Sequence, residues 1–77
     1  MSQPRFNGDL ARRQRIKLGY SVQQVAALLG KSRWSVYVYE GQRDIGPTPP
    51  IRRRLEDLYG LQPGDLLIDE EEEGDAA

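Results

Sequence analysis

The stretch from residue 22 to residue 42, VQQVAALLGKSRWSVYVYEGQ, constrains the fold of this chain more than any other. Its first half places three apolar residues on one face of a helix, at i, i+1 and i+4: Val25, Ala26 and Leu29. Ser21 is a suitable N-cap for that helix. Gly30 favours the left-handed conformation that ends a helix, and Ser32 supplies the N-cap of a second one. The pattern predicts two short helices joined by a tight turn.

In the second of these helices, Val36 and Tyr39 are three residues apart and would face the first helix. Ala26 lies four positions before Gly30, and its small side chain lets the two helices approach closely where they cross. This arrangement predicts a helix-turn-helix. The side chains expected on its opposite, outward face are Arg33, Trp34, Tyr37 and Val38.

Over roughly residues 10 to 67, the chain resembles the phage-repressor and Cro type of helix-turn-helix, also called the xenobiotic-response-element family. The residues that carry the resemblance are Arg15, Gly19-Tyr20-Ser21, Ala26, Leu29-Gly30, Ser32, Val36 and Tyr39-Glu40. The resemblance implies an all-α, lambda-repressor-like fold, a compact bundle of four to five short helices. It also implies a structural salt bridge between Arg15 and Glu40, for which a guanidinium is well suited.

The rest of the chain supplies three further segments that we expect to be helical, over residues 8–18, 50–59 and 62–68. Asn7 and Thr48 are the expected N-caps of the first two, and Pro49 in the first turn fits because its missing N–H has no helical partner there. Gly19 and Gly60 end these two helices.

Charge is distributed unevenly along the 77 residues, whose net charge is only -1. Residues 1–68 contain all 11 Lys and Arg but 6 of the 12 Asp and Glu, so this part has a net charge of +5. The remaining six acids lie in residues 69–77, where nothing apolar is long enough to be buried. We therefore divide the chain into a flexible arm (1–6), a helix-turn-helix domain (7–68) and a disordered acidic tail (69–77).

The composition argues against several functional classes. Without cysteine or histidine the chain has no disulfides and lacks the usual zinc ligands, so we expect no metal and no cofactor. The absence of a glycine-rich phosphate loop and of a plausible acid pair argues against an enzyme. No apolar run approaches the length of a signal peptide or a membrane span, which predicts a cytoplasmic protein with no membrane partner.

The resemblance places the helix over residues 32–40 in the major groove of DNA. It implies base contacts from Ser32, Arg33, Trp34 and Val38, and backbone contacts from Lys31, Tyr37, Gln42 and Arg43. Arginine binds guanine O6 and N7 with two hydrogen bonds, so Arg33 is the expected specificity residue. Trp34 suits a thymine methyl or a sugar, but an indole half-packed against a neighbouring helix fits the pattern equally well. Val22 replaces a glutamine that often touches the DNA backbone in this family.

Two functions remain open at this stage. The first is a sequence-specific transcriptional regulator that binds double-stranded DNA as a homodimer. The second is a protein-interaction module. In that case the same fold presents to a protein partner an apolar surface on the first helix of the helix-turn-helix. That surface comprises Val22 and Leu28, with Trp34 and Val38 beside it.

Overall fold

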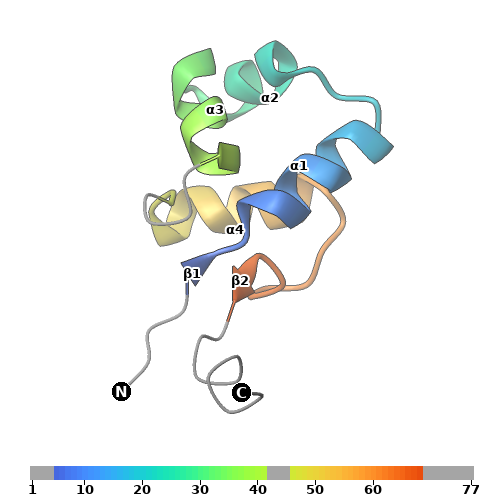
Figure 1. Ribbon diagram of the computed structural model, residues 1–77, viewed down its shortest axis with the longest axis vertical. Helices are drawn as coiled ribbons and strands as arrows, with labels where there is room; N and C mark the ends of the chain where they lie inside the picture. The colour runs from blue at the N-terminus through green and yellow to red at the C-terminus, as the bar shows by residue number, and fades with distance from the viewer. Residues whose placement is uncertain (1–4, 42–45, 69–77) are drawn as a thin grey trace.

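The computed structural model describes residues 5–41 and 46–68, which form four helices and two very short strands (Figure 1). The elements in chain order are β1 (Arg5–Phe6), α1 (Gly8–Lys17), α2 (Val22–Leu29), α3 (Arg33–Gly41), α4 (Pro49–Leu58) and β2 (Leu67–Ile68). In Figure 1, α2 and α3 lie at one end of the molecule, the strands lie at the other, and α1 and α4 lie between them. The expected compact helical bundle is confirmed, with a two-stranded sheet added to it.

Local sequence signals set the ends of the helices that carry the candidate site. At the start of α2, the Ser21 hydroxyl accepts a hydrogen bond from the Gln24 amide (3.0 Å), and the Gln24 side chain accepts one from the Ser21 amide (2.7 Å). This reciprocal capping box satisfies two amides that have no partner inside the helix. Gly30 follows α2 with a φ of +69°, the left-handed conformation expected of it. The Ser32 hydroxyl then accepts from the Ser35 amide (3.2 Å) at the start of α3.

The N-terminus of α4 differs from the prediction in one respect. Thr48 occupies the N-cap position with an extended backbone, but its hydroxyl makes no capping hydrogen bond. Pro49 and Pro50 follow directly, and neither has an N–H group. Thr48 therefore lacks one of the donors that an N-cap side chain normally binds.

The core collects apolar side chains from every element except β2, and from the segment just before it. The buried apolar side chains are those of Phe6, Ala11, Val25, Ala26, Leu29, Val36, Leu55, Tyr59 and Leu66. The inward faces predicted for α2 and α3 from their spacing are thus the faces that pack together.

The C-terminal segment corrects the expected fifth helix over residues 62–68. A turn around Gly64, whose φ is +92°, is followed by β2, which pairs with β1 in antiparallel register, Arg5 opposite Ile68 and Phe6 opposite Leu67. A positive φ interrupts a helix, and this turn directs the chain back towards β1. The sequence predicts a flexible arm over residues 1–6, but Arg5 and Phe6 form β1, and Phe6 is buried. Residues 1–4 and the predicted acidic tail lie outside the described residues.

Glu56, which the sequence analysis did not single out, fastens this C-terminal segment to α4. Its side chain is fully buried, and its carboxylate accepts hydrogen bonds from Arg52 Nη1 (3.0 and 3.2 Å). The amides of Gly64 (2.9 Å) and Leu66 (3.1 Å) donate to the same carboxylate. A buried carboxylate needs such compensation for its lost hydration. Glu56 therefore holds Leu66 in the core.

We expect Glu56→Gln to destabilise the fold strongly, since it removes the charged partner of Arg52 and replaces one of the two acceptor oxygens by an NH2 group, which cannot accept a hydrogen bond. Losses of ~3–5 kcal/mol accompany removal of one partner from a buried pair. Asp57→Asn removes the exposed neighbouring acid and is the matched control. Urea unfolding midpoints measure both; equal shifts would contradict the clamping role of Glu56.

Gly8, the first residue of α1, lies against the backbone at the C-terminal end of α3. A Cβ atom at this position would lie 2.8 Å from the carbonyl oxygen of Glu40 and closer still to that of Tyr39. Both neighbours are backbone atoms, which move only with their helix. A side chain at residue 8 would therefore push α3 away from α1.

Gly8→Ala should accordingly destabilise the protein by ~1–3 kcal/mol, the usual cost of overpacking. Gly41→Ala is the control, because a Cβ there would meet no atom within 4 Å. Thermal unfolding of the two variants tests this contrast. If Gly8→Ala unfolds at the wild-type temperature, the approach of the two helices is not tight.

Candidate nucleic-acid interface

Helices α2 and α3 form a helix-turn-helix joined by residues 30–32. The turn closes with a hydrogen bond from the Lys31 amide to the Ala26 carbonyl (2.9 Å), and Ala26 itself is buried where the helices meet. Val36 provides the buried contact of α3. The opposite face of α3 is left towards solvent.

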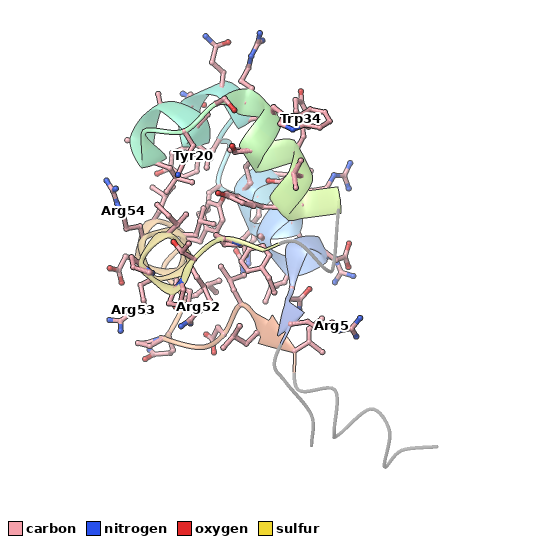
Figure 2. The ribbon with its side chains drawn as sticks, turned by 90° about the vertical axis from the view of Figure 1, so that its left-hand side faces the viewer. Arg5, Tyr20, Trp34, Arg52, Arg53 and Arg54 are labelled. Carbon is pink, nitrogen blue, oxygen red and sulfur yellow. The ribbon has the colours of Figure 1, made fainter. Side chains whose placement is uncertain are left out.

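The outward face of α3 and the turn before it carry two large exposed aromatic residues and two cations. Trp34 is 74% exposed and Tyr37 is 58% exposed. Figure 2 shows Trp34 projecting away from the body of the molecule. Lys31 and Arg33 are also exposed, and neither forms an ion pair or a side-chain hydrogen bond within the described residues. The alternative in which Trp34 packs against a neighbouring helix is wrong.

The other expected contact residues are less open. The Ser32 hydroxyl, although exposed, is engaged as an N-cap and lies 3.3 Å from Ser35 Oγ. Val38 is half-buried. Gln42 and Arg43, expected to contact the DNA backbone, lie outside the described residues. The accessible chemistry of the described interface therefore centres on Lys31, Arg33, Trp34 and Tyr37.

Arg15 and Glu40 form a bidentate ion pair behind this face. Arg15 Nε lies 2.7 Å from Glu40 Oε2, and Arg15 Nη2 lies 3.1 Å from Glu40 Oε1. Their side chains are only 12% and 7% exposed. A third hydrogen bond joins Arg15 Nη1 to the carbonyl of Tyr20 (3.0 Å), in the connection between α1 and α2. Hydrogen bonding to Glu40 raises the pKa of the Arg15 guanidinium above its already high usual value.

Tyr59 packs close to this ion pair from the end of α4. Its ring lies 6.4 Å from that of Tyr20 between centroids. Burial raises the pKa of the Tyr59 phenol, and the negative charge of Glu40 raises it further. The phenol is thus held neutral in the core beside the charged pair.

A shallow groove that the sequence analysis did not anticipate lies beside the ion pair, between α1, the N-terminus of α2 and α3. Its lining residues are Arg12, Arg15, Ser21, Val22, Tyr37, Glu40 and Gly41. Arg12 is exposed there, on the same face of α1 as Arg15 because the two are three residues apart. That spacing is the signal that sequence inspection could have used. Val22 is half-buried and packs against the core, so it is not a freely presented apolar residue.

The three consecutive arginines of α4 lie on a different side of the molecule. Figure 2 places Arg52, Arg53 and Arg54 at the side opposite Trp34. Arg52 pairs with the buried Glu56, and Arg54 Nη2 donates to the carbonyl of Leu28 (3.2 Å), joining α4 to the end of α2. Two of these arginines are therefore used in the fold.

Within residues 5–41 and 46–68, no helix has the length and apolar character needed to cross a membrane. The same part of the chain holds no cluster of three or more acidic residues arranged to bind a metal ion.

The chain is similar to one curated archaeal protein. No protein-family model matches it, and no solved structure matches it at a significant level. The relative comes from Thermococcus gammatolerans and is named "Putative HTH-type transcriptional regulatory protein". The two are 40% identical over 66 residues, which cover 82% of this chain and 20% of the relative. The chain thus spans about a fifth of that protein's length.

The ion pair gives a direct stability prediction. Glu40→Ala should destabilise the protein by up to ~3–5 kcal/mol, because it leaves Arg15 charged and nearly excluded from water. Asp9→Ala is the matched control, since Asp9 forms an exposed pair with Arg13 (2.6 Å) on α1, and such pairs contribute ~0–1 kcal/mol. Urea midpoints for both variants test the contrast. Similar midpoints would mean that the buried pair contributes no more than the surface pair.

Proposed function

We propose that this chain is a sequence-specific transcriptional regulator that binds double-stranded DNA with α3 in the major groove. The observation that supports it most is the outward face of α3 and the turn before it. There Lys31 and Arg33 are exposed and have no ion pair among residues 5–41 and 46–68, and Trp34 is exposed as well. The inward face of the same helix is held by Val36 and Glu40. A helix anchored on one side and open on the other suits insertion into a groove ~12 Å wide.

The roles of the side chains follow from their chemistry. Arg33 would read a guanine through O6 and N7, while Trp34 and Val38 supply apolar surface and Ser32 a hydroxyl near the base edges. Lys31 and Tyr37 would contact phosphate, together with Gln42 and Arg43 in the segment that follows α3. Arg12, exposed in the groove beside α3, adds a further cation. The +5 charge of residues 1–68 favours association with a polyanion.

A single unit of this size would cover a short half-site. We therefore propose a homodimer on DNA, with half-sites about one helical turn (~34 Å) apart. The name of the archaeal relative supports the assignment to transcriptional regulation.

The second candidate is a protein-interaction module. Leu28 is 51% exposed on α2, and with Trp34 it gives the helix-turn-helix two large apolar side chains open to solvent. Affinity for duplex DNA at several salt concentrations separates the two functions. Each neutralised phosphate contributes about −0.9 to the slope of log affinity against log salt, so a steep decrease in affinity with salt supports DNA binding. Absence of duplex binding at low salt favours the protein partner.

For the DNA-binding function, we predict that Arg33→Ala weakens binding to the preferred duplex by ~1–3 kcal/mol and changes binding to random duplex much less. The preferred duplex is obtained by selection from a random pool, and a palindromic site would support the dimer. Arg53→Ala, which removes an exposed arginine of α4 opposite α3, is the control and should leave the preference unchanged. An equal loss on both duplexes for Arg33→Ala would make Arg33 a phosphate contact.

A further inference from the structure

Trp34 is the most exposed of the large apolar side chains in the part of the chain that the structure describes. It is 74% exposed, ahead of Tyr37 on the next turn of α3. Arg33 precedes it and Val38 follows four positions later, so that Trp34 and Val38 are neighbours on the helix surface. An indole has one N–H donor and a broad apolar surface, and it gains most from a site where that surface leaves water.

Double-stranded DNA offers such a side chain few apolar groups. The base faces are stacked within the duplex and are not available to a helix in the major groove. The exposed base edges carry donors and acceptors, with one apolar exception, the 5-methyl group of a pyrimidine. The two exposed cations that precede Trp34, Lys31 and Arg33, match the phosphates and the guanine edge that would lie near that methyl group.

We propose that Trp34, with Val38 beside it, recognises the 5-methyl group of one pyrimidine in each half-site. The inference rests on the proposed DNA-binding function and adds the chemical group that α3 reads besides guanine. Thymine and 5-methylcytosine both carry this group, and the experiment distinguishes them.

The test uses the full chain and the duplex enriched from the random pool. Each thymine of that duplex is replaced singly by uracil, which removes only the methyl group and keeps every hydrogen-bonding atom. We expect one position per half-site to lose affinity about fourfold, the fold-change that corresponds to ~0.8 kcal/mol for one buried CH₂-sized group. A second arm places a G·C pair at that position, with and without a 5-methyl group on the cytosine. Restored affinity with 5-methylcytosine means that the methyl group itself is read, whichever base carries it; affinity restored by thymine alone assigns the site to thymine.

Variants of exposed residues connect this sensitivity to Trp34. Trp34→Ala should bind the thymine and uracil duplexes equally, while Trp34→Phe keeps an apolar ring and should retain part of the difference. Leu28→Ala removes another exposed apolar side chain, outside α3, and should keep the whole difference. Circular dichroism spectra check that all three variants are folded.

The outcomes separate this inference from the function on which it rests. Absence of binding to any duplex overturns both. Sequence-specific binding with no uracil-sensitive position, or with a sensitivity that Trp34→Ala leaves intact, overturns the methyl recognition by Trp34 alone.

Discussion

The ion pair of Arg15 and Glu40 is the interaction on which the arrangement of the helices depends. It joins α1 to the end of α3 with two hydrogen bonds, and Arg15 also holds the carbonyl of Tyr20 in the connection that leads to α2. Both charges are nearly excluded from water, so neither is stable in this environment without the other. Gly8, at the other end of α1, lies against the backbone of Tyr39 and Glu40, so the ion pair and this glycine together fix the orientation of α3.

A second buried pair performs the same task at the other end of the molecule. Glu56 joins Arg52 to the amides of Gly64 and Leu66, and so holds the chain in place before β2 pairs with β1. A chain of this size buries only ~60% of the surface that its unfolded form exposes, which limits what apolar packing alone can determine. In this protein, charged groups specify how the ends of the helices meet, while apolar residues fill the space between them.

The parts of the structure that follow from local rules could be predicted from the sequence. Ser21, Gly30 and Ser32 act through neighbours within a few residues, and the inward faces of α2 and α3 follow from helical periodicity. The partnership of Arg15 and Glu40 came from a family resemblance, since nothing local connects residues 25 positions apart. Glu56 was missed because, four residues after Arg52, it reads as an ordinary surface pair. Two-residue strands are too short to show any periodicity.

The position of the candidate site depends on which charges remain unpaired, and a count of charges does not reveal this. Residues 1–68 have a net charge of +5, and the longest run of consecutive cations in the sequence is Arg52, Arg53 and Arg54 in α4. In the structure, Arg52 is neutralised by Glu56 and Arg54 is bound to a backbone carbonyl of α2, whereas Lys31 and Arg33 remain exposed beside Trp34. Arg52 and Arg54 therefore stabilise the fold, whereas Lys31 and Arg33 stay open to solvent. This pattern of pairing within the protein supports α3 as the proposed binding face.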